Sequence, residues 1–500
     1  MKEASGFEIV AARCWNLVNE GKPFTPIFTA GAFLLYHISD WGSGSFWLGT
    51  ALAALLLVPL FAVWFIYDYP LFMRNYLWLP FVAYFFIWGV PELGIGLWTI
   101  ALYFFFTVFF WGTLYYHLRI GTSWLNFRRF WKLVLKNSDS TSGNAQEQLP
   151  KTLLLVYLWE RLHTELLGSG AFAIEAPTVL AFTAAVALLS YVLHRNLFDW
   201  KPKEDLSFTH ERYAEPLEPM TGKVIVLVID GMRKERFDVA RTPFLDRLRQ
   251  GGTEYTQMET VYPARTVVCF SSMFTGTYPR EHGIQSNMVW KLGIRVESIF
   301  DSLRKIGKKG RLLGIAHLID SMGDDVESVT AVMHNDKADR FIVERAKKIM
   351  AEQNPDLLVV QLIATDQTGH SMGVLYDEYV QKIEEADALL DEFVQWLEVN
   401  GHMQDTTLLV CADHGQADGI GGHGHLDEGE RFVPFFLYGP RIAQGRKIER
   451  RMSLTSVAPT IACLLGAPYP DHSRGDVLTE AWSTASSADK RENGVKGSTT

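Results

Sequence analysis

The chain has 500 residues, enough for two or three domains, and its formal net charge of −9 at pH 7 gives no reason to expect nucleic acid as a partner. Its mean hydropathy of +0.05 averages two unlike halves. The first two-fifths is crowded with Phe, Trp, Leu and Tyr, whereas the remainder has the mixed charge of a water-soluble enzyme. The four cysteines show no CxxC or paired spacing, which indicates small core residues and argues against a disulfide framework.

Residues 1–198 predict an all-α transmembrane domain of about five helices. A crossing needs about 17 to 25 mostly apolar residues, and the first and third segments are the shortest candidates. The expected spans are residues 24–38, 45–67, 76–90, 93–116 and 177–193. Between the fourth and fifth spans, residues 124–136 form a basic amphipathic stretch, which is typical of a helix that lies along an anionic membrane surface.

Residues 152–167 carry ionisable side chains that argue against a sixth crossing. These side chains belong to Glu160, Arg161, His163 and Glu165. An odd number of spans places the two ends of the chain on opposite sides, and Lys and Arg gather before the first span, after the second and after the fourth. The positive-inside rule therefore predicts a multi-pass protein of the cytoplasmic membrane, with its N-terminus cytoplasmic and its C-terminal half extracytoplasmic. A crossing by residues 152–167 would invert this orientation.

The C-terminal half is organised around residues 224–231, an apolar and β-branched run that is ended by Asp230 and Gly231. Such a run predicts a buried parallel strand whose last residue projects into the crevice beyond its carboxyl end. Strand and helix patterns then alternate across residues 222–482, which predicts a doubly wound α/β domain with a mostly parallel sheet and helices on both faces. Residues 199–221 predict a linker, and residues 483–500 a disordered tail.

Polar side chains follow several of the predicted strands, and the parallel arrangement brings them to one edge of the sheet. A proline upstream and an apolar run downstream also place Thr266 at a helix N-terminus, where backbone N–H groups favour an anion. The collected set is Asp230, Thr266, Asp366, His370, Asp413, His414 and a histidine of the segment 421–425.

Taken singly, each of these residues is weak support for a site, because an Asp at a strand end often only caps a turn. Together they suit two closely spaced divalent cations, since carboxylates and imidazoles are the ordinary zinc ligands. Two metals about 4 Å apart can clamp the attacking and leaving oxygens of a displacement at phosphorus. A hydroxyl in such a site loses its proton readily and becomes a nucleophile.

At these residues the sequence resembles the alkaline phosphatase superfamily, and most closely its nucleotide pyrophosphatase/phosphodiesterase branch. The resemblance runs from about residue 223 to 481 and includes none of the membrane half. Its motifs occur in the order of that family, at residues 228–231, 262–266, 275–284, 365–370 and 412–415.

The resemblance implies an alkaline-phosphatase-like fold and a role for each matching residue. One zinc is expected to bind Asp230, Asp413 and His414 together with the nucleophile Thr266. The second zinc is expected to bind Asp366, His370 and a third histidine. Asn287 matches the position whose side chain contacts a non-bridging phosphate oxygen.

The third histidine has two candidates, His423 and His425. In the nucleotide pyrophosphatases this ligand lies far downstream of the Asp-His-Gly motif, whereas here both histidines follow it within a dozen residues. The short spacing is similar to that of the ethanolamine-phosphate transferases of the same superfamily, and it favours His423. Cys269, three residues after Thr266, is predicted to be a buried small residue and not a catalytic thiol.

The sequence therefore predicts a membrane-anchored two-zinc hydrolase of the phosphodiesterase/pyrophosphatase type, with other divalent metals as alternatives. Thr266 would attack phosphorus, Asn287 and the Thr266 backbone amide would stabilise the developing charge, and water would release the phospho-threonine. Five spans exceed what a tether needs, so the expected partners are membrane lipids and a lipid-linked or headgroup phosphodiester; protein partners are not identified. The rival hypotheses are a headgroup phosphotransferase and a non-catalytic membrane receptor.

Overall fold

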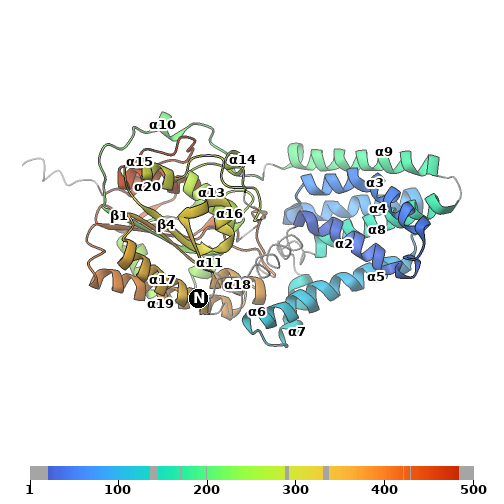
Figure 1. Ribbon diagram of the computed structural model, residues 1–500, viewed down its shortest axis with the longest axis horizontal. Helices are drawn as coiled ribbons and strands as arrows, with labels where there is room; N and C mark the ends of the chain where they lie inside the picture. Colours follow the sequence, from blue (N-terminus) through green and yellow to red (C-terminus); the bar gives the residue numbers. More distant parts are fainter. Residues whose placement is uncertain are drawn as a thin grey trace, which may run out of the picture.

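The computed structural model describes residues 21–135, 145–168, 172–198, 200–287, 292–329, 337–419, 422–427 and 429–483. Within these residues the chain forms a helical bundle and an α/β domain that lie side by side (Figure 1). The predicted tail falls almost entirely outside the described residues. The predicted linker is largely irregular and contains one short helix, α10 (Thr209–Arg212).

The bundle consists of long helices that run between two ends, one of which faces the α/β domain (Figure 1). These helices are α2 (Gly21–Tyr36), α3 (Gly44–Ile66), α4 (Trp78–Trp88), α5 (Leu93–Phe104) with its continuations η3 (Phe105–Tyr115) and α6 (Tyr116–Ile120), α8 (Ala145–Gly168), and α9 (Phe172–Val192) with η4 (Leu193–Leu197). Two shorter helices connect them at the end near the α/β domain: η2 (Leu71–Leu77) and α7 (Asn126–Leu135).

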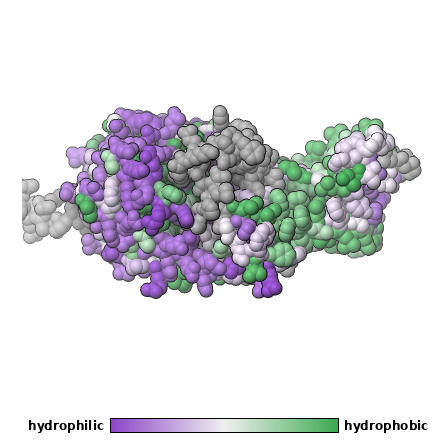
Figure 2. All heavy atoms as spheres, turned by 60° about the horizontal axis from the view of Figure 1, so that its bottom comes forward, coloured by the Kyte–Doolittle hydropathy of each residue, from purple (hydrophilic) through white to green (hydrophobic). Residues whose placement is uncertain are grey.

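In the part of the chain that the structure describes, three helices are long and apolar enough to cross a membrane, which indicates a membrane protein. They are Gly44–Ile66, Leu93–Leu118 and Ile174–Leu197. Hydrophobic side chains cover much of the visible bundle surface, whereas the surface of the α/β domain is mostly hydrophilic (Figure 2). The remaining predicted spans form shorter helices, of 16 residues in α2 and 11 in α4.

Helix α8 lies inside the bundle, where it packs against α2, α3, α4 and α5. Helix α8 is not among the helices that are long and apolar enough to cross a membrane, and the expectation that residues 152–167 do not cross stays a prediction. The apolar middle of α8 is buried, and ionisable residues in both its first and its second half have partners. Glu160 Oε2 is 2.7 Å from His37 Nε2, and Arg161 donates a hydrogen bond to Glu175. Pairing reduces the cost of removing these groups from water, and composition alone does not reveal it.

With α8 in the bundle, the chain enters and leaves the bundle at the same end. Thr25, near the start of α2, donates a hydrogen bond of 2.8 Å to Gln148, near the start of α8. At the other end of the described part of α9, His194 contacts the carbonyl oxygen of Asp68, whose carboxylate accepts a hydrogen bond from Tyr262 of the α/β domain. The predicted placement of the two chain ends on opposite sides is thus not supported by this arrangement.

The α/β domain contains an eight-stranded sheet in the order β10-β2-β9-β7-β1-β6-β4-β5. The strands are β1 (Lys223–Ile229), β2 (Thr253–Tyr255), β4 (Gly310–Ile315), β5 (Val326–Val329), β6 (Leu357–Leu362), β7 (Thr406–Cys411), β9 (Phe435–Tyr438) and β10 (Arg446–Ile448). The central strand β1 pairs in parallel with β6 and β7, and β9 is antiparallel to both of its neighbours. A small second sheet has the order β11-β3-β8, from Met452–Ser453, Met258–Glu259 and Phe432–Val433.

Helices cover both faces of the large sheet, as Figure 1 shows, and the predicted doubly wound fold is confirmed. One face carries α13 (Thr266–Thr275), α15 (Ile299–Lys305) and α20 (Val457–Leu465), and the other carries α12 (Pro243–Gly251), α17 (Ala338–Gln353) and α19 (Asp377–Val399). The central strands are continuous apolar runs because both of their faces are buried. Their carboxyl ends meet at one edge of the sheet.

Candidate metal centre

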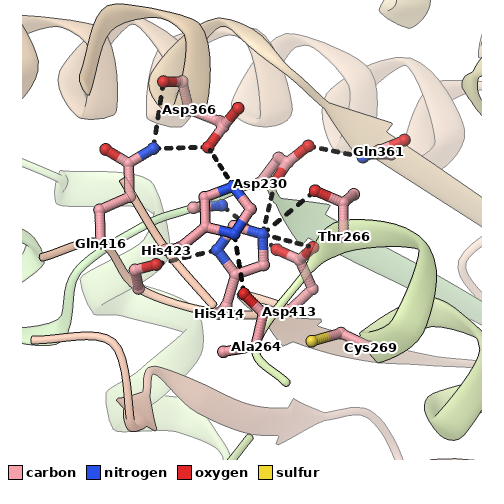
Figure 3. A network of polar contacts seen from close by, with 12 residues as sticks. Asp230, Ala264, Thr266, Cys269, Gln361, Asp366, Asp413, His414, Gln416 and His423 are labelled. Carbon is pink, nitrogen blue, oxygen red and sulfur yellow. Dashed lines mark hydrogen bonds and ion pairs between the residues drawn. The ribbon is translucent and has the colours of Figure 1, made fainter. Parts of the chain in front are cut away.

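Three neighbouring strands deliver three carboxylates to that edge. Asp230 follows β1 directly, and Asp413 follows β7 after one residue. Asp366 lies in the first turn of α18 (Ala364–Met372), the helix that follows β6. Because these strands are parallel neighbours, residues distant in sequence come together around one small volume, as Figure 3 shows.

Asp230, Asp413 and His414 form the first group of ligand atoms. His414 Nε2 is 3.5 Å from Asp230 Oδ1 and 3.4 Å from Asp413 Oδ2. Both of these carboxylate oxygens are buried, and within the described residues they have no hydrogen-bond partner. Two ligands of a tetrahedral ion held at about 2.0–2.2 Å lie about 3.3–3.6 Å apart, so the spacing fits a zinc-sized cation.

Asp366, His370 and His423 form the second group. Asp366 Oδ1 is 3.4 Å from His370 Nε2 and 3.7 Å from His423 Nε2. His425 is buried outside both groups, and its backbone N–H donates to Glu430. Of the two candidates for the third histidine, the geometry therefore brings His423 to the centre.

The backbone fixes the orientation of two histidine rings. His414 Nδ1 lies 2.8 Å from the carbonyl oxygen of Gly415, and His423 Nδ1 lies 2.8 Å from that of Ala264. A carbonyl oxygen only accepts, so Nδ1 carries the proton in each ring and Nε2 presents a lone pair to the centre. Histidines that bind metals commonly donate their second ring N–H to a backbone carbonyl in this way.

The electrostatics of the site also favour added positive charge. Burial raises the pKa of Asp230, and the Asp413 and Asp366 carboxylates raise it further. Burial likewise raises the pKa of Asp413, although His414 opposes that shift. At Asp366 burial opposes ionisation, but His370 and His423 outweigh it and lower the pKa. Three crowded carboxylates therefore lack enough compensating charge, and divalent cations would supply it. The donor set fits two such ions.

Thr266 lies beside this centre, at the first position of α13, where the N-terminus of the helix favours an anion. Its Oγ1 is 3.1 Å from His414 Nε2. Asn287 Oδ1 accepts the Val267 N–H at 3.0 Å, so this side chain is held next to the same helix N-terminus. The structure thus brings together all eight residues that the sequence indicated: Asp230, Thr266, Asn287, Asp366, His370, Asp413, His414 and His423.

Cys269 is fully buried, with its Sγ 3.3 Å from Thr260 Oγ1. Burial raises the pKa of its thiol well above the ordinary value, which disfavours the thiolate that a nucleophile or ligand would need. This environment agrees with a small core residue.

Two glutamines that the sequence analysis missed hold the carboxylates in place. Gln361 Nε2 donates to Asp230 Oδ2 at 2.7 Å, and Gln416 Nε2 donates to both the side chain and the backbone carbonyl of Asp366. A Cβ at Gly369 would lie 1.7 Å from Gln416 Oε1, so only glycine leaves room for this contact. Gln361 gave one signal in the sequence, as a polar residue within the apolar run of β6.

Residues 224–305 and 321–437 match the family model described as type I phosphodiesterase / nucleotide pyrophosphatase. Over 151 residues, which are 30% of this chain and 13% of the relative, the chain is 30% identical to the human GPI ethanolamine phosphate transferase 3, catalytic subunit. Over 222 residues, which are 40% of this chain and 24% of the relative, it is 24% identical to the human ectonucleotide pyrophosphatase/phosphodiesterase family member 1.

The solved structure of murine ectonucleotide pyrophosphatase / phosphodiesterase 5 overlaps 52% of this chain and 100% of that chain, with 15% identity and a TM-score of 0.46. The chain spans only 13% and 24% of the lengths of the two human relatives. The matches confirm the resemblance of the α/β domain to the alkaline phosphatase superfamily and to its nucleotide pyrophosphatase/phosphodiesterase branch. The matched relatives are named as a phosphate transferase and as a pyrophosphatase/phosphodiesterase.

Proposed function

We propose that the protein is a membrane-anchored two-metal phosphodiesterase that forms a covalent intermediate on Thr266. One observation carries the proposal: two groups of carboxylate and imidazole ligands, buried except for the partly exposed His370, lie beside the N-terminus of the helix that begins with this threonine. Metal ligands without a nucleophile would fit a structural site, and a threonine without ligands would fit an ordinary helix start. Their combination fits phosphoryl transfer.

The bound metal ions would supply Lewis acidity, which lowers the pKa of the Thr266 hydroxyl and offsets negative charge on the phosphoryl oxygens. Thr266 Oγ1 releases its proton to solvent and attacks phosphorus, the new bond forms as the bond to the leaving oxygen breaks, and the leaving group takes up a proton from solvent. The N-terminal amides of α13 then stabilise the charge on the phosphoryl group. Asn287 Oδ1 is occupied by the Val267 N–H, so Asn287 would donate to phosphate through Nδ2.

The second half of the reaction decides between hydrolysis and transfer. Water attacking the phospho-threonine gives a hydrolase, whereas a lipid or glycan hydroxyl gives a transferase, and in both cases Thr266 leaves with its oxygen and regains a proton. The match to a GPI ethanolamine phosphate transferase favours transfer as the second candidate function. We favour hydrolysis because the family model that covers most of the α/β domain is that of phosphodiesterases.

The substrate class that we propose is a lipid-linked or headgroup phosphodiester. A single helix would suffice as a tether, yet the bundle contains several long helices and a basic helix, α7, at the end near the α/β domain. Such a helix suits anionic headgroups at the surface of a leaflet. The metal centre lies in the domain next to this end.

We also propose a new orientation in place of the extracytoplasmic one. The loops at the end near the α/β domain carry basic residues: Arg74, Arg128, Arg129 and Lys132. The loops at the opposite end, residues 39–44 and 91–92, carry none. Since the chain enters and leaves the bundle at the basic end, the positive-inside rule favours a cytoplasmic face for the α/β domain and the N-terminus alike.

The test uses the full-length protein, purified in detergent and loaded with zinc. Wild type and Thr266→Ala are incubated with a membrane lipid extract and, separately, with a nucleotide diester, and the products are separated by mass. Release of a headgroup, or its movement onto another lipid, that depends on Thr266 supports the proposal and tells hydrolysis from transfer. Cleavage of the nucleotide diester alone, with no change in any lipid, would contradict the lipid substrate class.

A further inference from the structure

We propose that the membrane bundle is a structural part of the metal centre, and that Arg74 is the positioning residue through which it acts. Arg74 lies in η2, between two bundle helices, and holds the loop that carries His423. This inference rests on the proposed function, because it assumes that His423 binds a metal ion. It goes further by assigning a role in the site to a residue outside the α/β domain.

The His423 loop, residues 422–427, contains neither helix nor strand that would hold it in place. Glu430 Oε2 accepts hydrogen bonds from the backbone N–H groups of Gly424 at 2.8 Å and of His425 and Leu426 at 3.1 Å each. Leu426 has a φ of +59°, in the left-handed region that residues other than glycine seldom adopt. A loop wound around one carboxylate with a strained residue needs support from outside to keep a single conformation.

The bundle provides that support at Asp427, four residues after His423. Its Oδ1 accepts the backbone N–H of Leu71 at 2.8 Å, and its Oδ2 lies 3.5 Å from Arg74 Nη2. Asp427 is 6% exposed and Arg74 is 0% exposed, so both charges are removed from water. A buried ion pair fixes the relative position of its two chains because each charge is costly without the other.

Arg74 is itself held firmly within the bundle. Its Nε donates to the Tyr69 carbonyl oxygen at 3.2 Å and lies 3.8 Å from Glu147 Oε2 at the start of α8. Lys151 Nζ is 2.5 Å from the other oxygen of Glu147. The guanidinium therefore lies between the Glu147 carboxylate of α8 and the Asp427 carboxylate of the His423 loop. It connects that loop to α8.

Two further contacts show that this support extends to two other segments of the site. Asn126 Nδ2 of α7 donates at 2.9 Å to the Ser371 carbonyl oxygen in α18, the helix that carries Asp366 and His370. Tyr262, four residues before Thr266, donates to the Asp68 carboxylate. The bundle thus contacts each of three segments that carry site residues, which a simple tether would not require.

The experiment measures zinc binding by the full-length protein in detergent, by elemental analysis after equilibration against a zinc buffer. Cobalt-substituted protein gives an absorption spectrum as an independent signature of ligand geometry. The variants are Arg74→Gln, Asp427→Asn and the double variant. Asp427→Asn keeps an oxygen for the Leu71 N–H while it removes the charge, so it decides the matter if Arg74→Gln does not fold.

Two matched controls each remove another Arg–carboxylate pair. Arg161→Gln breaks the pair with Glu175 at the opposite end of the bundle, and Arg129→Gln breaks a pair of 2.9 Å with Glu378 that joins the two domains away from the His423 loop. Neither pair includes a residue of the His423 loop. The first control reports on damage to the bundle, and the second on loosened contact between the domains.

We expect Arg74→Gln and Asp427→Asn each to weaken zinc binding at one of the two sites about 10- to 100-fold and to alter the cobalt spectrum. The double variant should be no worse than either single variant, since both break one interaction. Retention of both ions by these variants, or an equal loss in the two controls, would overturn the inference alone. Wild-type protein that binds no divalent metal would overturn the proposed function instead.

Discussion

The two halves of the molecule place their charged residues by different rules. In the α/β domain, parallel strands end at one edge, so that carboxylates far apart in sequence converge on one centre. In the bundle, Glu160 and Arg161 of α8 pair with residues of other segments, His37 and Glu175. A polar motif at a strand end therefore predicts where its side chains lie. A charged residue in an apolar segment does not predict its own position until its partner is known.

The membrane topology gives the clearest test of this difference, because its outcome is all or none. Tags at the N-terminus and after Trp482 should lie on the same side of the membrane, and a tag in the loop 39–44 on the other. The measurement is labelling of intact and opened cells with a reagent that does not cross membranes. Termini on opposite sides would show that α8 does not cross the membrane. The ionisable residues of α8 would then predict its position as well as the strand-end motifs predict theirs.

Thr266→Ala should have the largest effect on turnover, a loss on the order of 10⁴-fold or more, because it removes the proposed nucleophile. Zinc content should fall little, since the other ligands remain. The assay is steady-state cleavage of a phosphodiester, with zinc measured in parallel. Thr266→Ser retains a hydroxyl and serves as the control; a Thr266→Ala enzyme with undiminished turnover would exclude the covalent mechanism.

Asp366→Ala should weaken zinc binding at one site at least about 100-fold, as it removes a ligand and the partner of two histidines. Asp387→Ala is the matched control. This buried carboxylate accepts the N–H groups of Phe244 and Leu245 at the start of α12, away from the metal centre. The control should lose stability and keep both ions. Equal zinc loss in the two variants would mean that a lower stability of the domain, and not the removal of a ligand, weakens zinc binding.

Asp339→Asn should produce the smallest effect, a change in how stability depends on pH. Asp339 Oδ1 accepts the N–H groups of Ile363 and Ala364 at the start of α18, and burial raises its pKa to about 6. A raised carboxyl pKa means that the folded state binds the proton more tightly, so this contribution is complete below about pH 4 and is lost as pH rises through 6.

Between pH 4 and 7 the wild type should therefore lose about 2 kcal/mol of stability relative to Asp339→Asn, which does not titrate. The measurement is urea unfolding of both proteins, followed by fluorescence across this range. Taking the difference between the proteins cancels what other titrating groups contribute. A difference that stays constant with pH would show that Asp339 is ionised throughout.

The sequence predicted the structure best where a local pattern determines the position of a residue. The runs of β1, β6 and β7 predicted buried parallel strands, and the doubly wound fold is confirmed. The spacing of His423 after the Asp-His-Gly motif favoured the histidine that lies in the second ligand group. In each case a local pattern is sufficient, because strand order and motif order together fix the position.

Contacts between distant segments could not be predicted in this way. Gln361 and Gln416 act on carboxylates 131 and 50 residues away, and no local pattern announces either contact. The partners of the α8 charges could not be predicted for the same reason, since His37 follows α2 and Glu175 lies in α9. The sequence around a buried polar residue does not show which distant residue pairs with it and stabilises it.

The shared entry and exit end of the bundle has a consequence for how such a protein can arise. A membrane module that begins and ends at one face can be added to a soluble enzyme, or removed from it, without moving that enzyme to another compartment. The enzyme then keeps the metal supply and the redox conditions in which it already folds. Adding or removing the whole bundle would thus leave the α/β domain on the same side of the membrane. The gain or loss of a single crossing helix would move the metal centre to the other side.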